Sequence, residues 1–171
     1  MAFVRDEAAD ETVRKDAALQ DHIHARRLIL WLPGAGAGVA VQGCLMLGGI
    51  GIAMSVLWYW PLSVERFKYY IAGIALGALP MALIFNAVVR GVASARMNMF
   101  RLSVVHALIA ALETLTFLVM GRRPSSLMAL AALAASLLAI RIVSGPGYAL
   151  LAAIYRAQRA QLSTHRERAS S

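Results

Sequence analysis

The sequence predicts an all-α polytopic membrane protein with four transmembrane helices. Hydrophobic residues make up 60% of the 171 positions and charged residues 15%, whereas a soluble domain is about half apolar and a quarter charged. The stretch from Leu28 to Val64 has no charged residue over 37 positions, although about 20 apolar residues suffice to cross a bilayer. A chain this short leaves no room for a separate soluble catalytic domain of ordinary size.

Four apolar segments supply the expected spans. They lie at about 39–60, 69–89, 102–120 and 127–143, within a transmembrane bundle predicted for residues 28–147. The first span is cut from the long charge-free run at Pro33-Gly34, and it ends at an aromatic girdle followed by Pro61. Pro80 should kink the second span. Loop two, which separates the second and third spans, is expected at about residues 90–101.

Polar segments flank this bundle. Residues 1–27 contain two acid–base pairs four residues apart, which favour a cytoplasmic helix; a frayed tail fits the same residues. The C-terminal segment, residues 148–171, follows a Gly-Pro-Gly break. Its residues 148–162 predict a helical piece that lies on the membrane surface or extends the fourth span, and the tail after Gln161 is expected to be loose. The acid–base pairs are Asp10–Arg14 and Glu11–Lys15.

The distribution of basic residues predicts the orientation. The N-terminal segment, loop two and the C-terminal segment share twelve Lys and Arg residues, against four in the other two loops. Because Lys and Arg are retained in cytoplasmic segments, both termini are expected in the cytoplasm. Arg outnumbers Lys 15 to 2 in an Ala-rich chain, a composition typical of high-GC bacteria. The expected location is therefore a bacterial inner membrane.

Small residues spaced four apart mark three candidate packing faces. Helices in lipid gain much of their association energy from close backbone approach, which small side chains permit. Such a face can hold the bundle together or contact another subunit, and we expect that at least one of the three faces a partner protein. The residues are Gly36, Ala40, Cys44 and Gly48 in the first span, Gly73 and Gly77 in the second, and Ala131, Ala135 and Ala139 in the fourth.

The third span carries a polar side within the membrane. At 100° per residue, His106 and Glu113 lie on one face of this helix. Glu113 is about 16 Å from the cytoplasmic end of the span at 1.5 Å per residue, and a charge at that depth costs about 2.5–3.5 kcal/mol. Arg141 of the fourth span is its expected partner. The cluster of His106, Glu113 and Arg141 can fix helix register, relay protons or ions, or pair with another subunit.

Other chemistry is disfavoured. His22 and His24 point to different faces of a helix, no cysteine lies near them, and the one spare histidine, His165, is distant, so neither a metal nor another cofactor is expected. The glycines at 34–38 lack the Lys-Ser/Thr of a phosphate-binding loop. Basic residues are spread along the chain, which argues against nucleic acid. No serine is placed for nucleophilic catalysis, so the protein is not expected to be an enzyme.

These observations support three functional hypotheses. The first is a non-enzymatic inner-membrane subunit or accessory factor of a multiprotein complex of the secretion, conjugation or envelope-assembly type, with membrane lipid and other membrane subunits as partners in a homo- or hetero-oligomer. The second is a small proton- or ion-coupled transporter component that uses the intramembrane cluster. The third is a membrane immunity protein against a pore-forming toxin, favoured only by size and span number.

Overall fold

The computed structural model describes residues 2–16, 34–59 and 63–170. Within these ranges, side-chain packing is described except at 2–6, 58–59, 64–67, 69–70, 72–73, 75–77 and 165–170. The described residues form six helices and no strand, which confirms the predicted all-helical class. The helices are α1 (Ala2–Lys15), α3 (Ala35–Tyr59), α4 (Val64–Val89), α5 (Ala95–Val119), α6 (Arg123–Val143) and α7 (Pro146–Ser170).

Three of these helices are candidate membrane spans. Helices α3, α5 and α6 are long and apolar enough to cross a bilayer. Helix α4 has 26 residues, but among the described residues only its second half, Ala78–Val89, stands out as a shorter apolar helix. The described part of the chain is therefore helical, with three helices able to span a membrane, and the fourth span stays a prediction.

The helices extend beyond the apolar segments that predicted them. Helix α5 begins at Ala95 rather than near residue 102, so most of the predicted loop two is helical and only a short turn at 90–94 remains. Helix α7 continues through Ser170, where a loose tail was expected after Gln161. Hydropathy predicts only the apolar part of a helix. Backbone hydrogen bonds can continue into polar residues, so the helix can be longer than its apolar segment.

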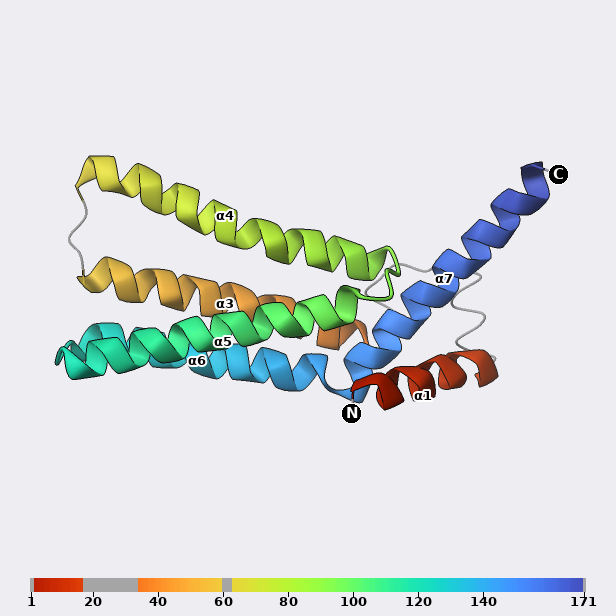
Figure 1. Cartoon of the computed structure of the whole chain (residues 1–171), viewed down its shortest axis with the longest axis horizontal. Coiled ribbons are helices and arrows are strands. Elements are labelled where there is room, and N and C mark those ends of the chain that lie inside the picture. Colours follow the sequence, from red (N-terminus) through yellow and green to blue (C-terminus); the bar gives the residue numbers. More distant parts are fainter. Residues whose placement is uncertain (1, 17–33, 60–62, 171) are drawn as a thin grey trace.

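The long helices lie side by side (Figure 1). Helix α6 packs against both α3 and α5, and α4 contacts α3, α5 and α7. The buried side chains of α4 lie in its second half, at Met81 and Val88. Helix α1, the α4–α5 turn and α7 all lie at one end of the bundle, and the α5–α6 turn lies at the other (Figure 1). We call these the α7 end and the far end.

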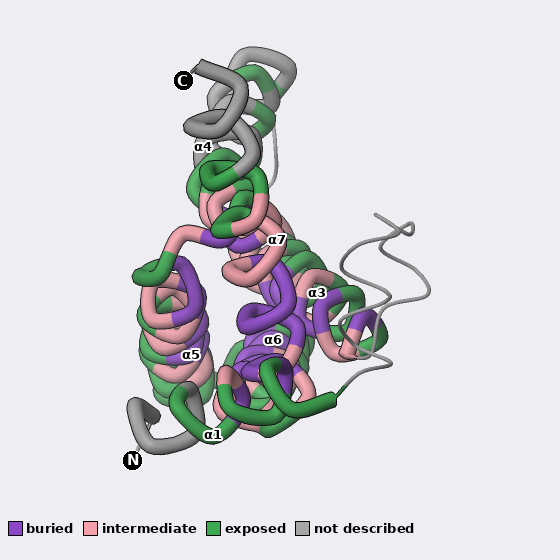
Figure 2. The backbone as a smooth tube through the Cα atoms, turned by 90° about the vertical axis from the view of Figure 1, so that its right-hand side faces the viewer, coloured by how far each residue is buried: buried purple, intermediate pink, exposed green. Residues whose placement is uncertain are grey.

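The densest core lies where α7 meets the bundle. The helical structure is interrupted at Ser144-Gly145. Helix α7 then starts at Pro146, a residue suited to the first turn of a helix. From Tyr148 to Tyr155 every described side chain except Leu150 is buried, which Figure 2 shows as a purple segment at the centre of the molecule. A helix that is apolar on all sides is buried on all sides. Helices α1, α3, α4 and α6 surround this half of α7.

Candidate functional site

Glu113 meets a serine of α3. Its side chain is half-buried on α5, and its Oε2 lies 2.7 Å from Oγ of Ser55. Ser55 is fully buried, and the same Oγ lies 2.7 Å from the backbone oxygen of Ile52. Glu113 is about 9 Å from the end of α5 at Val119, at 1.5 Å per residue. The carboxyl is therefore held between α3 and α5 in the far half of the bundle.

Ser55 is a site residue that helical spacing in the sequence did not indicate. It is the only serine between Ala35 and Tyr59, and it lies about as far from the end of α3 as Glu113 lies from the end of α5. Helices α3 and α5 run in the same direction, so a comparison of polar residues by their distance from the far end of each helix would have paired the two. Spacing along one helix carries no such information, because register between helices depends on the turns that join them.

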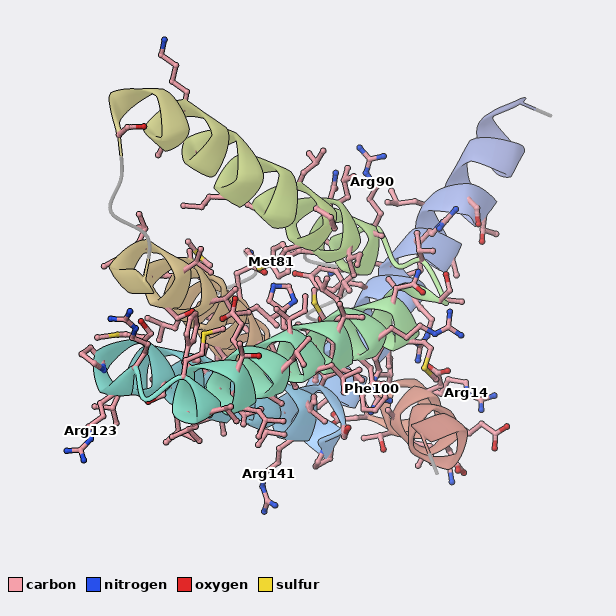
Figure 3. All side chains as sticks on the ribbon, turned by 60° about the vertical axis from the view of Figure 1, so that its left-hand side comes forward. Arg14, Met81, Arg90, Phe100, Arg123 and Arg141 are labelled. Carbon is pink, nitrogen blue, oxygen red and sulfur yellow. The ribbon has the colours of Figure 1, made fainter. Side chains whose placement is uncertain are left out.

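Arg141 does not join this site. Its side chain is exposed and extends away from the bundle (Figure 3), in the last turn of α6 at the α7 end. If the α5–α6 hairpin is aligned at its turn, the residue of α6 level with Glu113 is near Ala129, and Arg141 is about 18 Å further along the axis. Helix α6 starts at Arg123 rather than at about residue 127 as predicted, and this earlier start moves Arg141 further from the level of Glu113.

His106 bonds within its own helix. The ring Nδ1 lies 3.0 Å from the backbone oxygen of Leu102, and the side chain is half-buried. His106 and Glu113 share a flank of α5 as predicted by periodicity, but about 10 Å of helix axis separates them at 1.5 Å per residue. The structure thus places Glu113 with Ser55, and it places His106 and Arg141 apart from that pair.

The packing faces are rotated from the predicted stripes. In α3, Gly48 is buried, Cys44 is half-buried, and Gly36 and Ala40 are exposed. In α6, Ala139 is buried while Ala135 is half-buried and Ala131 is exposed. A spacing of four residues drifts by 40° at each step, so a long stripe leaves the contact face. The packing of Gly73 and Gly77 in α4 lies outside the described residues.

Other small residues bring α3 and α6 into close contact. A Cβ built on Gly48 would lie 3.0 Å from Oγ of Ser136, and one built on Gly51 would lie 2.9 Å from Cβ of Ala132. On α6 the buried positions after Ser125 lie three or four residues apart, which keeps them on one face. They are Ser125, Ser126, Ala129, Ala132, Ser136, Ala139 and Val143.

At the α7 end, α1 docks on α7. Ala9 and Val13 of α1 are buried, and Asp10 Oδ1 forms an ion pair with Arg156 Nη2 at 2.9 Å. Glu11 pairs with Lys15 at 2.6 Å as expected from their spacing, whereas Asp10 reaches across to α7 instead of pairing with Arg14. An open cavity of about 410 Å³ remains between the two helices, lined by Ala8, Ala9, Thr12, Pro146, Ala149 and Leu150. We call this helix pair the α1–α7 platform.

A buried arginine joins α5 to the end of α6. Arg96 is 5% exposed, and its Nε donates a hydrogen bond of 3.1 Å to the backbone oxygen of Val143. This oxygen belongs to the last turn of α6, where helix carbonyls have no intrahelical partner. The sequence placed Arg96 among the basic residues of the predicted loop two. The burial of Arg96 could not be predicted from the sequence, because it depends on helix α5 starting before Arg96.

Tyr148 lies beside this arginine in the core. Burial raises the pKa of its phenol to about 12, and the Arg96 guanidinium offsets part of that effect. In the folded protein we therefore expect Tyr148 to ionise only near pH 12, two units above the ordinary value of 10.0. Tyr148 ionises at a lower pH in the unfolded chain than in the folded protein. The contribution of its buried neutral phenol to stability is therefore fully present below about pH 10 and is lost as the pH rises through about 12.

An absorbance titration of tyrosinate, with Tyr148→Phe as the comparison, measures this directly. The difference between the two proteins should appear only near pH 12. A difference centred near pH 10 in the folded protein would contradict the burial of this phenol.

No protein-family model, curated protein or solved structure matches the chain. Within the part of the chain that the structure describes, no three His, Cys, Asp or Glu side chains come together as a metal site would require. The class of protein therefore follows from the fold alone: an all-helical protein with apolar helices compatible with a membrane.

Proposed function

We propose that this chain is a non-enzymatic subunit or accessory factor of a multiprotein complex in a bacterial inner membrane, of the secretion, conjugation or envelope-assembly type. The observation that carries the proposal is the second half of α7. The helix is anchored in the core as far as Tyr155 and then continues past the bundle (Figure 1). A buried root with a projecting helix suits a docking element better than it suits an isolated membrane anchor.

The projecting part of α7 has little packing of its own. Arg159, Ala160, Ser163 and Thr164 are exposed, and Leu162 is 44% exposed. A helical segment of about a dozen residues is marginal in water without tertiary contacts. A partner that covers this segment would stabilise it. Because the segment contains Arg159, Arg166 and Arg168 against Glu167 alone, the partner surface is expected to be acidic.

The α1–α7 platform supports the same proposal. It ties the N-terminal helix to the base of α7 through the Asp10–Arg156 pair, so α1 and the base of α7 form one surface at the α7 end. We place this surface in the cytoplasm. Ten of the twelve basic residues that the sequence groups together lie in α1, the α4–α5 turn, the start of α5 and α7, and basic segments stay on the cytoplasmic side.

One-sided labelling of cysteine variants tests this orientation. In a Cys44→Ala background, an impermeant maleimide should label Arg122→Cys in intact spheroplasts and Lys15→Cys only after lysis. The opposite labelling pattern would reverse the orientation, and labelling of both or neither from outside would put the two ends of the bundle on the same side.

Purification of the tagged chain from its own membranes in mild detergent tests the subunit proposal. We expect a defined assembly with another membrane protein, and we expect Arg159→Glu to lose most of that partner because it removes the net positive charge of the projecting segment. Arg123→Glu is the matched control, since Arg123 is exposed at the far end (Figure 3). A monomer without partners, or equal recovery of partner with both variants, would contradict the proposal.

A further inference from the structure

The hydroxyl of Ser55 has two close neighbours that are both oxygens. One is the backbone oxygen of Ile52 and the other is Oε2 of Glu113, each at 2.7 Å. That distance is typical of a full O–H···O hydrogen bond. Each such bond needs its own hydrogen, and a serine hydroxyl has only one to donate. If Glu113 were ionised, one of the two contacts would be between acceptors with no hydrogen between them.

A neutral carboxyl removes this conflict. A protonated Glu113 donates from Oε2 to Oγ of Ser55, and Ser55 then donates to the oxygen of Ile52. Every oxygen in the chain of contacts is satisfied, and no charge is left at a depth where a charge is costly. We propose that Glu113 and Ser55 form a proton-binding site between α3 and α5, occupied by a proton in this structure.

The surroundings of the site contain few charges that could replace the proton. Between Ala35 and Leu57, α3 has no Asp, Glu, Lys, Arg or His. On α5, His106 bonds to Leu102 two turns away. On α6, Arg123 and Arg141 are both exposed. On α4, Lys68 is exposed, and the side chains of Glu65 and Arg66 lie outside the described residues.

Proton loss at this site acts on the contact between two helices. An ionised Glu113 competes with the backbone oxygen of Ile52 for the one hydroxyl hydrogen of Ser55. Ser55 can then donate a hydrogen bond to only one of the two, and its contact with the other is lost. Ser55 is fully buried, and water is not at hand to compensate. Proton release therefore weakens the α3–α5 contact and proton binding restores it. This coupling needs no partner and is independent of the docking surface on α7.

Labelling with dicyclohexylcarbodiimide in lipid vesicles tests the site. The reagent reacts with a neutral carboxyl: the acid proton moves to one carbodiimide nitrogen, the carboxyl oxygen adds to the central carbon, and the adduct rearranges to a stable N-acylurea that retains the whole reagent. At about pH 7 a carboxyl in water is neutral in only about one molecule in 500, given an ordinary Glu pKa of about 4.3. We therefore expect labelling of Glu113 to exceed that of carboxyls in the N-terminal segment by about a hundredfold.

Matched variants separate the site from general effects of substitution. Glu113→Gln should abolish the label yet keep the fold, because the amide nitrogen can donate to Ser55. Ser55→Ala should label several times faster, since the acid hydrogen is no longer held in a hydrogen bond. Ser103→Ala is the control: Ser103 is also buried, but its hydroxyl bonds to Met99 within α5, and its removal should leave the labelling rate unchanged.

Infrared spectroscopy of the same vesicles covers the case in which the reagent cannot reach the site. At about pH 7 the difference between wild type and Glu113→Gln should show the C=O band of a neutral carboxyl. A carboxylate band in its place would overturn the proposal, whatever the labelling result. Protection from the reagent by sodium at constant pH would assign the site to a metal cation and would overturn it as well.

Discussion

Replacement of Gly51 by alanine is expected to destabilise the bundle by about 1–3 kcal/mol, the usual range for overpacking a close contact. The new Cβ would lie 2.9 Å from Cβ of Ala132, 3.2 Å from the backbone oxygen of Met128 and 3.3 Å from Cα of Ala132. None of these atoms belongs to a side chain that can rotate away. Helix α3 must therefore move away from α6, and Gly51→Leu should prevent the two helices from packing at all.

Gly43 supplies the matched control for this experiment. It lies in the same helix, and a Cβ built on it meets nothing within 4 Å. Gly43→Ala makes the same chemical change in an exposed position and should not lower the free energy of unfolding. Unfolding in mixed detergent micelles, followed by circular dichroism, gives the comparison. Equal stability of Gly43→Ala and Gly51→Ala would show that α3 and α6 do not approach as closely as the structure has them.

The sequence predicted the helices well because their signals are local. Long apolar runs identify α3, α5 and α6 by hydropathy alone, and the Gly-Pro-Gly break before α7 is a property of three adjacent residues. Each of these signals can be read without knowing what the segment contacts. The same is true of the Glu11–Lys15 pair, which bridges one turn of α1.

Contacts between helices were much harder to predict. In a span as rich in glycine and alanine as α3, several faces carry small residues at helical spacing, and only the neighbour decides which one is buried. Gly36 and Gly51 look alike in the sequence, yet one is exposed and the other packs against Ala132. Arg141 was expected as the partner of Glu113, but the partner depends on the register between helices, and the structure places Ser55 beside Glu113.

The burial of α7 was equally hard to predict from the sequence. The sequence predicted that residues 148–162 form a helical piece on the membrane surface or extend the fourth span, whereas Leu151, Ala152, Ala153, Ile154 and Tyr155 are buried consecutively. Alanine and tyrosine suit both a surface helix and a core helix, so composition does not separate the two. The difference arises because four helices converge there, which only the tertiary structure reveals.

Gly91 is where the second large effect is expected. This glycine lies in the α4–α5 turn with φ +67, and a Cβ on it would lie 2.5 Å from the backbone oxygen of Tyr155 and 3.1 Å from Cα of Arg156. Gly91→Ala therefore meets two penalties. A left-handed conformation costs a residue with a Cβ about 1–2 kcal/mol, and the clash with the backbone of α7 adds to it. We expect a total loss of more than about 3 kcal/mol, with the turn detached from α7.

Gly121 separates these two penalties. It lies in the α5–α6 turn at the far end with φ +70, and a Cβ on it meets nothing within 4 Å. Gly121→Ala should therefore show the conformational cost of about 1–2 kcal/mol alone. The unfolding free energies of the two variants, together with amide exchange in the turn at 90–94, measure the difference. Similar losses in both would mean that α7 does not rest on the α4–α5 turn. A larger loss at Gly91 would show that α7 is held by the bundle itself, as a helix anchored for docking must be.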